Sequence, residues 1–481
     1  MDIRGGILEV LTEEQVRDIH LASLEILERT GVEVPDRGLL DLCHESSANV
    51  DFEKGRVRFP AWLVEEQVQK APSRFTWYGR SSDRKIRMEG TRVHFGAASS
   101  ALFTIGLDGV RRPTTLADAG NFARLVDGLD NIHDGWCVVH PRDVPDWAAH
   151  AHMMLAIMRN TEKPFKGRVY GADQAKDCIQ MAEILAGGSE QMRRRPNLLT
   201  NVNPVSPLMH GDDLLAGTKE YLKRGLPIIF SSEIQAGATG PVTLAGTLVQ
   251  HNAEVLSAIV MAQLMSPGNP VVYGMVSSIM DMRRGTIAYA AMEAALLNAA
   301  AAQIARFYGL PCRGTAGFSD ANLLDMQTGF ESGMTVLMAA LAGVNFILGS
   351  AGAIESTLTA SFEKLVIDEA MLGMVVRALQ GIEVNDGTLA VDLIDQVGPG
   401  GNYLVEDNTL QYLKKEHYLP DLIARVNRDI FEMEGRRGIR DLARAKAEKI
   451  LSEHHPSPLD EGVERELEKV VKAAEERGPA K

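Results

Sequence analysis

Short apolar runs alternate with longer segments whose apolar residues recur at helical spacing through the middle of the chain. The short runs, which are typical of buried strands, are residues 92–97, 135–140, 165–171, 197–203, 227–233, 270–277, 310–316 and 344–349. The longer segments are predicted as helices at 116–129, 147–159, 172–186, 212–224, 243–264, 289–308, 327–341 and 362–379. Eight successive strand–helix units indicate parallel connections, and eight such units close naturally into a TIM (β/α)8 barrel.

The alternative fold is an open, doubly wound α/β sheet. Such sheets often bind a phosphate through a GxGxxG or GxxxxGK[ST] turn, and neither motif occurs at the expected place in this chain. We therefore predict an α/β protein whose TIM barrel spans residues 91–381. The piece LDG at 107–109 separates two short β-like runs and predicts a hairpin inserted after the first strand.

Extensions flank the predicted barrel on both sides. Thr12, followed by two glutamates, starts a predicted helix that stops at Gly31, and residues 1–90 are predicted to form a small α+β extension. Residues 382–481 begin with a loop containing VGPGGNYL and continue as charged helices from residue 410 to about 477. These helices are too polar to form a core alone, so we expect them to wrap the barrel or to meet a partner.

Composition narrows the class of protein. Of the 481 residues, 45% are hydrophobic and 24% are charged, which is ordinary for a globular protein. The net charge of −14, without a basic stripe, argues against nucleic-acid binding. The N-terminus lacks the apolar stretch of a signal peptide, and the most apolar run, 255–265, is too short to cross a membrane. The four cysteines lie far apart, so we expect reduced thiols in a cytoplasmic protein.

In a TIM barrel the active site lies at the C-terminal ends of the strands. Candidate side chains at or just after those ends are Phe95, His140, Tyr170, Asn201, Asn203, Glu233, Tyr273, Phe318, Asp320 and Glu355. Gln327 and Glu331 are four residues apart and share a face of the following helix. Several of these residues have a structural alternative. His140 can be a core or edge residue whose hydrogen bonds are satisfied, and the asparagines can cap or form a turn before a proline. Gln327 and Glu331 can form a solvated helix face.

Three of these residues carry the strongest expectation of function. Glu233 directly follows the apolar run PIIFSS, and a carboxylate buried there needs a cation, a donor or water. Phe318 and Asp320 follow the seventh predicted strand, on a loop whose glycines at 314 and 317 let the backbone approach a ligand closely. That loop is either the mouth of a binding site or a solvated surface loop.

No motif for a bound metal or a nucleophile is convincing. His150 and His152 lie on different faces of a predicted helix, and neither HExxH nor GxSxG occurs. We therefore predict no metal site and disfavour zinc and hydrolytic chemistry. The VGPGG loop either holds a phosphate on its backbone amides or is only a tight turn.

Four stretches together resemble the trimethylamine methyltransferase family, in its branch without pyrrolysine, which includes glycine betaine–corrinoid protein methyltransferases. They are RGGILEVLTEEQVRDIHLASLEILERTGVEV at the start, YGLPCRGTAGFSDANLLDMQTGFE, GVNFILGSAG with SFEKLVIDEAM after it, and DLIDQVGPGGNYL. The resemblance covers nearly the whole chain. It implies a TIM barrel that moves a methyl group from a methylamine to the Co(I) of a separate corrinoid protein.

The resemblance also bears on substrate, cofactor and partner. The chain contains only the twenty standard residue types, so the absence of pyrrolysine favours a quaternary amine of the betaine type, with glycine betaine as the first expectation. The corrinoid (cobalamin) is expected on the partner protein, and no cofactor is expected to bind tightly to this chain. A homo-oligomer is also expected, because barrels with large helical extensions often pair.

The chemistry implied by the resemblance assigns roles to the candidate residues. Glu233 and Asp320 are expected at the catalytic centre, with aromatic rings and Glu355 around the ammonium group. Arg313, Arg168, His140 and the two asparagines are the candidates for a substrate carboxylate. Two alternatives stay open: a TIM-barrel lyase or isomerase that acts on a small carboxylate through an acid–base pair such as Glu233 with His140, and a non-catalytic protein that holds a corrinoid partner.

Overall fold

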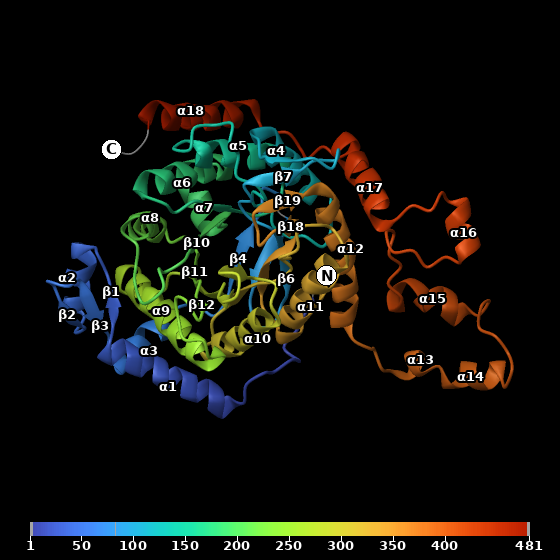
Figure 1. Ribbon diagram of the computed structural model, residues 1–481, viewed down its shortest axis with the longest axis horizontal. Helices are drawn as coiled ribbons and strands as arrows, with labels where there is room; N and C mark the ends of the chain where they lie inside the picture. The colour runs from blue at the N-terminus through green and yellow to red at the C-terminus, as the bar shows by residue number, and fades with distance from the viewer. Residues whose placement is uncertain (1–2, 82, 479–481) are drawn as a thin grey trace.

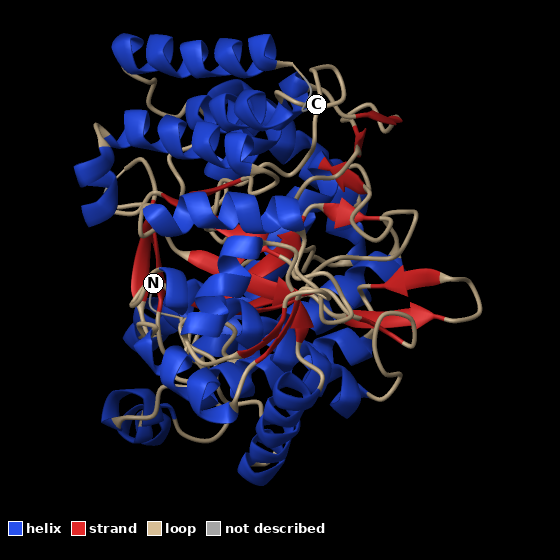
Figure 2. Cartoon of the chain, turned by 90° about the vertical axis from the view of Figure 1, so that its left-hand side faces the viewer, coloured by secondary structure: helices blue, strands red, loops and turns tan. Residues whose placement is uncertain are grey.

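The computed structural model describes residues 3–81 and 83–478, shown in Figure 1. Its centre is a sheet of seven parallel strands, around which the helices lie (Figure 2). In spatial order these strands are β6 (His94–Ala97), β17 (Phe346–Ala351), β16 (Cys312–Thr315), β13 (Val271–Met275), β11 (Ile228–Ser232), β10 (Leu198–Val202) and β9 (Phe165–Gly167). Every neighbouring pair in this order is parallel.

The predicted helices are present with nearly the predicted bounds. They are α4 (Leu116–Asp127), α5 (Ala149–Asn160), α6 (Ala172–Ala186), α8 (Asp212–Lys223), α9 (Leu244–Met265), α10 (Met292–Phe307), α11 (Met326–Ala342) and α12 (Phe362–Gln380). Each parallel connection passes through a helix, which is how parallel strands are joined. The predicted class, an α/β protein with a TIM-type barrel, is confirmed.

The strand predicted at residues 135–140 is wrong. Residues 132–139 occupy the eighth position between the edge strands β6 and β9, but they form no regular ladder. The amide of His133 donates to the carbonyl of Phe95 at 2.8 Å, and the amide of Gly135 donates to that of Pro164 at 2.8 Å. The segment therefore bridges both edges of the sheet with isolated hydrogen bonds.

Side chains take the place of the missing ladder. The buried ammonium of Lys163 donates to the carbonyl oxygens of Val126, Leu129 and Ile132, so all three of its donors are used. Asp134 accepts the amide of Ala97 at 3.0 Å. These bonds fix the chain in an irregular course that the apolar pattern of residues 135–140 does not reveal.

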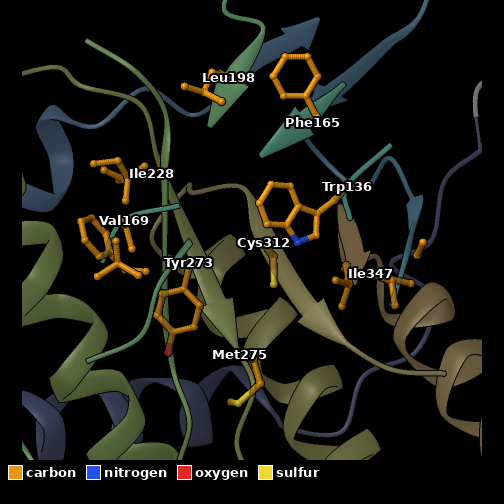
Figure 3. Packing of buried hydrophobic residues seen from close by; sticks show 14 of the residues in the cluster. Trp136, Phe165, Val169, Leu198, Ile228, Tyr273, Met275, Cys312 and Ile347 are labelled. Atoms are coloured by element: carbon orange, nitrogen blue, oxygen red, sulfur yellow. The ribbon is translucent and has the colours of Figure 1, made fainter. Parts of the chain in front are cut away.

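The interior of the barrel is packed at its N-terminal end. Leu199, Ile229, Val272, Phe346 and Leu348 point inward, and a hairpin of β4 (Phe75–Tyr78) and β5 (Lys85–Met88) closes that end with Trp77, Ile86 and Met88. Their neighbours along the strands belong instead to the outer core beneath the helices, among them Phe165, Leu198, Ile228, Tyr273, Cys312 and Ile347 (Figure 3). Open space in the barrel is thus left at the C-terminal strand ends.

The N-terminal residues form α1 (Glu13–Arg29), α2 (Arg37–Glu45), α3 (Ala61–Lys70) and a small sheet of β1 (Val32–Glu33), β3 (Arg56–Arg58) and β2 (Asn49–Asp51). The predicted cap at Thr12 is present as a capping box with Gln15. The predicted hairpin after the first strand is present as β7 (Phe103–Ile105) and β8 (Arg111–Pro113).

Several short elements lie in the loops that connect the barrel strands and helices. They are β12 (Gln235–Ala236), β14 (Ser278–Asp281), β15 (Thr286–Ala288), β18 (Ala353–Ile354) and β19 (Thr359–Ser361), while α7 (Ser189–Arg194) precedes β10. The sequence pattern did not predict them, because two to six residues are too few for a period to show. Within the described ranges, no helix is long and apolar enough to cross a membrane.

The C-terminal residues behave in two different ways. α17 (Ile439–Glu453) and α18 (Glu461–Arg477) lie on the barrel, where Arg440 and Arg444 both pair with the buried Glu363 of α12. The intervening α13 (Asp386–Leu389), α14 (Val391–Val397), α15 (Asp407–Glu416) and α16 (Arg428–Met433) stand at the side of the molecule, away from the strands (Figure 1). The division at residues 90 and 381 stays a prediction.

Candidate active site

A cavity of about 290 Å³ opens at the C-terminal ends of the barrel strands. Its walls come from β9, β10, β11, β13, β16 and β17 and from the loops that follow them. The side chains that line it divide into two groups of opposite charge. One group is Asn203, Glu233, Tyr289 and Phe318, and the other is Lys166, Arg168 and Arg313, with the Trp136 ring centroid 5.5 Å from Lys166 and 5.8 Å from Arg168.

Glu233 is the centre of the acidic and aromatic group. One of its carboxylate oxygens accepts the hydroxyl of Tyr289, and the other accepts the amide of Asn203 at 3.1 Å. The Tyr289 ring meets the Phe318 ring edge-on, with the centroids 5.9 Å apart. Burial, together with the Glu233 charge, raises the pKa of the Tyr289 phenol, so it stays a neutral donor. This wall offers a carboxylate and two aromatic rings to a cation.

Phe318 is held in place by close packing. It is almost fully buried at 6% exposure, and its ring lies against Gly349 so closely that a Cβ there would come within 2.3 Å of a ring carbon. Gly349 also has a φ of 86°, in the left-handed region that favours glycine. Only glycine at residue 349 therefore leaves room for this ring.

Asp320 lies behind this wall and outside the cavity lining. Its carboxylate accepts the amide of Ala290 at 3.0 Å and the hydroxyl of Ser356 at 2.7 Å. Burial raises the pKa of Asp320, and the nearby Glu331 acts in the same direction. Asp320 thus fixes the loops that carry Tyr289 and Thr357, both of which line the cavity.

Gln327 and Glu331 support the same loop. Glu331 accepts the hydroxyl of Ser319 at 2.7 Å and the amide of Asp320 at 3.0 Å, while Gln327 donates to its other oxygen at 2.8 Å. The two residues do share a helix face. They hold the loop from outside and are absent from the described lining of the cavity.

Three cations also line the cavity. Arg168 donates to the hydroxyl of Ser100 and to Nδ1 of His140, both at 3.1 Å, and its guanidinium lies 5.8 Å from the Trp136 ring centroid. Burial lowers the pKa of His140, and the Arg168 charge lowers it further, so the imidazole is a neutral acceptor. Arg313 donates to the carbonyl of Met275 at 3.0 Å, and its buried Nε has no partner.

Lys166 lies on β9, two residues before Arg168. Its Nζ is 3.8 Å from Asp134 and 5.5 Å from the centroids of both Trp136 and Phe346. Burial lowers the pKa of Lys166 to about 7, against the opposing pull of Asp134, and burial also raises the pKa of Asp134. One carboxylate oxygen of Asp134 has no hydrogen-bond donor. Lys166 therefore loses its proton more readily than an exposed lysine.

The loop of residues 355–357, at the edge of the cavity, has an unusual backbone conformation. Glu355, Ser356 and Thr357 are three consecutive residues with positive φ, at 53°, 50° and 81°, and none is glycine. Such conformations cost about 1–3 kcal/mol each and are concentrated at functional sites. Glu355 forms an ion pair with Arg111 at 2.8 Å and accepts the hydroxyl of Thr359 at 2.6 Å. It ties the strained loop to the β7–β8 hairpin and does not line the cavity.

The structure brings six of the predicted site residues together around one cavity: Tyr170, Asn201, Asn203, Glu233, Arg313 and Phe318. His140 adjoins it through Arg168. Phe95 and Tyr273 do not face it. Each is fully buried in the outer core, since it sits one position out of phase with the inward residues of its strand. Tyr273 instead donates its hydroxyl to Asn252 at 3.0 Å.

Sequence reasoning did not select Lys166, Trp136 or Tyr289. Lys166 had a signal, because a lysine two residues before Arg168 in an apolar strand places both cations on one face. Trp136 lies in the irregular eighth position, and Tyr289 lies 56 residues from its partner Glu233. The sequence therefore held no local signal for either residue. In the described part of the chain, no three of the His, Cys, Asp and Glu side chains are grouped as metal ligands.

A parallel barrel with a charged cavity at the C-terminal strand ends is the arrangement of a barrel enzyme. Comparison with known proteins makes the class specific: the sequence pattern of the trimethylamine methyltransferase (MTTB) family matches residues 3–479, and the chain belongs to this family. The resemblance noted in the sequence is thus confirmed, and so is the expectation of a methyltransferase.

Named relatives cover almost the whole chain. It is 36% identical to glycine betaine methyltransferase of Desulfitobacterium hafniense (strain Y51), over 96% of both chains. It is 34% identical to trimethylamine methyltransferase MttB of D. hafniense (strain DSM 10664 / DCB-2), over 98% of this chain and 95% of that one. Among solved structures, the Methanosarcina barkeri monomethylamine methyltransferase (MtmB) matches with a TM-score of 0.48 at 12% identity, over 91% of this chain and 94% of that one.

Proposed function

We propose that this protein transfers a methyl group from a betaine, with glycine betaine as the first expected substrate, to the Co(I) of a separate corrinoid protein. The observation that carries the proposal is that one cavity is lined both by a carboxylate with aromatic rings and by three cations. A betaine has a quaternary ammonium at one end and a carboxylate at the other. The named relative at 36% identity, a glycine betaine methyltransferase, supports the same substrate.

The acidic wall suits the ammonium end. Glu233 supplies the opposing charge, and the rings of Phe318 and Tyr289 supply aromatic faces, for which a desolvated cation gains about 2 kcal/mol. The cationic wall suits the carboxylate end. Arg313 has a buried donor without a partner, and Lys166 and Arg168 line the same cavity. A substrate with only one of the two charges leaves one wall uncompensated, which is costly in a buried site.

The chemistry asks little of the protein beyond binding and orientation. The Co(I) supplies the electron pair that forms the new bond to the methyl carbon, and the electrons of the broken C–N bond stay on the nitrogen. The amine leaves neutral, so no general acid is needed. Glu233 and Tyr289 position the nitrogen and exclude water around it, while the cationic wall holds the other end, so that one methyl group points out of the mouth.

Access for the partner comes from the same end of the barrel. A large exposed hydrophobic side chain follows each of the seven strands. These residues, which we call the rim, are Val110, Tyr170, Val205, Val242, Met282, Leu323 and Leu358, with Met326 at the start of α11. Parallel strands end on one side, so the rim surrounds the cavity. Such a collection of apolar side chains marks an interaction site, and a corrinoid protein docked there reaches the methyl group without crossing water.

The direct test is methyl transfer to reduced cobalamin in the absence of oxygen. With glycine betaine we expect methylcobalamin to form together with one equivalent of dimethylglycine, and we expect far slower reaction with choline and trimethylamine, which lack the carboxylate. Faster reaction with trimethylamine than with glycine betaine would exclude the betaine assignment. Loss of substrate without methylcobalamin would favour the lyase alternative, although His140 and Glu233 contact different partners.

A further inference from the structure

The Lys166 side chain lines the cavity without a close partner for its ammonium group. The residue is 3% exposed, and its closest carboxylate oxygen, on Asp134, lies 3.8 Å from Nζ, which is beyond the range of a hydrogen bond. Among the described residues, that same oxygen of Asp134 has no hydrogen-bond donor. An amine and a carboxyl group therefore lie next to each other beside the cavity, and neither is fully satisfied.

Lys163, the buried lysine three residues earlier, provides a contrast. Burial lowers its pKa to about 8, but its Nζ donates to three carbonyl oxygens and the residue is absent from the described lining of the cavity. Burial lowers the pKa of Lys166 to about 7, and the charges of Arg313 and Arg168 add to this lowering. Desolvation beside other cations is a general way to make a lysine nucleophilic. Lys166 thus combines a neutral amine with access to a ligand, whereas Lys163 has no access.

We propose that Lys166 forms a reversible imine with a small 2-oxo acid, at the carbonyl carbon next to the carboxylate of that acid. Asp134 serves as the acid and base for this step. Arg313, whose buried Nε has no partner, and Arg168 line the same cavity and suit the carboxylate of the ligand. The cavity of about 290 Å³ admits only a small molecule of this class.

The step balances with these groups alone. The lone pair of neutral Nζ forms a bond to the carbonyl carbon, and the carbonyl oxygen takes the proton of the Asp134 carboxyl group, whose pKa burial raises. Nζ then returns a proton to Asp134. The same carboxyl group protonates the new hydroxyl, which leaves as water while the nitrogen lone pair forms the C=N bond. The products are a protonated imine on Lys166, an Asp134 carboxylate and one water molecule.

The imine and the proposed methyl transfer are separate properties of one cavity. A bound 2-oxo acid occupies the space that the betaine is proposed to use, so the two ligands exclude each other. Imine formation is measured with neither amine substrate nor cobalamin present. A protein that forms the imine but transfers no methyl group would contradict only the proposed function, and the reverse result would contradict only this inference.

The test is trapping of the imine with cyanoborohydride while the full chain is incubated with pyruvate at pH 7. Peptide mapping by mass spectrometry then locates the reduced adduct, which adds the mass of one pyruvic acid less one oxygen atom. We expect Lys166 to react at least about tenfold faster than Lys176, an exposed lysine of α6, because an ordinary exposed lysine, with a pKa of about 10.4, is almost wholly protonated at pH 7. Lys163 should stay unmodified.

Two comparisons test the ligand class and the residue. Acetone carries the carbonyl without the carboxylate, so its preference for Lys166 over Lys176 should be at least about tenfold smaller. Lys166→Arg keeps the positive charge but forms no imine, and its total labelling should fall to the level of exposed lysines. Equal rates at Lys166 and Lys176 overturn the proposal, as does equal modification of Lys163, which would reflect unfolding. Equal preferences with pyruvate and acetone overturn the 2-oxo acid as the ligand.

Discussion

Phe318 combines packing and binding in one ring. One edge of it fits over Gly349, and the ring meets Tyr289 edge-on at the cavity. The other residues of this wall are polar, so Phe318 is the main apolar surface beside the Glu233 carboxylate. A ring in that place excludes water from the substrate and offers its face to the ammonium group.

Phe318→Ala should lower the affinity for glycine betaine by about 1–2 kcal/mol, the scale of one desolvated cation–π contact. Phe318→Tyr, which keeps the ring, should lose far less. Isothermal calorimetry measures both, and the thermal midpoint of each variant shows whether the barrel is intact. Equal affinities for the wild type and Phe318→Ala would remove this ring from the ammonium site.

Glu233→Gln removes the negative charge of the same wall and keeps its shape. We expect weaker binding of glycine betaine, by about 1.5–3 kcal/mol for a charged contact, with unchanged thermal stability. Tyr289→Phe, which deletes only the hydroxyl that Glu233 accepts, should have a smaller effect on affinity. A Glu233→Gln protein that fails to fold would show that the carboxylate is structural.

Lys166 should make substrate binding depend on pH. Its pKa of about 7 means that the ammonium is charged below neutrality and is lost above it. Asp134 opposes this loss, whereas Arg168 and Arg313 promote it. Affinity for the carboxylate of glycine betaine should therefore fall by about tenfold as the pH rises from 6 to 8.5, the scale of one charged hydrogen bond.

The variant Lys166→Arg separates this residue from the rest of the cavity. It keeps a positive charge at all these pH values, so calorimetry between pH 6 and 8.5 should show a flat affinity. Lys166→Met should bind weakly and also show no slope. A slope in Lys166→Arg equal to that of the wild type would assign the titration to another group.

At the scale of elements, the eighth position of the barrel is held by side chains. Seven positions are strands whose backbone amides and carbonyls satisfy one another. In the eighth, Lys163 and Asp134 take over part of that task, and Trp136 is directed to the cavity. Because this segment forms no ladder, its backbone can place the Trp136 ring and the buried Asp134 carboxylate beside Lys166.

Lys163→Met should destabilise the protein by about 3 kcal/mol or more, because three buried carbonyl oxygens lose their donor. Denaturant unfolding measures the change. Lys176→Met, on the exposed face of α6, removes only a surface ion pair with Asp173 and should have little effect. Equal stability of the two variants would mean that water replaces the Lys163 ammonium.

At the scale of the whole molecule, two apolar surfaces lie at different places. The rim surrounds the cavity, and residues 382–433, which carry many exposed apolar side chains, leave from the opposite end of α12. The proposed partner of the rim is a methyl acceptor that arrives and leaves with each transfer. Both surfaces are formed by segments distant from the packed centre of the barrel.

Met282→Asp and Met326→Asp test the rim without touching the cavity lining. Each should raise the KM for the corrinoid protein by about tenfold or more, since a charge buried in an interface is costly, while the affinity for glycine betaine stays unchanged. Leu21→Asp, at an exposed position of α1 outside the rim, serves as the control. An unchanged KM in both rim variants would place the partner elsewhere.

The strands and helices of the barrel were predictable because burial on one face leaves a period in the chain. The same rule placed Asn201 and Asn203 on one face, where both line the cavity. It failed at Phe95 and Tyr273, since a strand that is buried on both faces shows no alternation from which to tell inward from outward. It also failed at residues 135–140, where an apolar run is buried without forming a ladder.

The sequence by itself determined the order of elements, the parallel connections, the family and the loop that carries Phe318, because each depends on residues close together in the chain. Only the tertiary structure decided which charges meet. Glu233 finds Tyr289 across 56 residues, and Lys166 finds Asp134 through an irregular segment. The two charged walls arise from strands that become neighbours only when the barrel closes, so no local pattern specifies them.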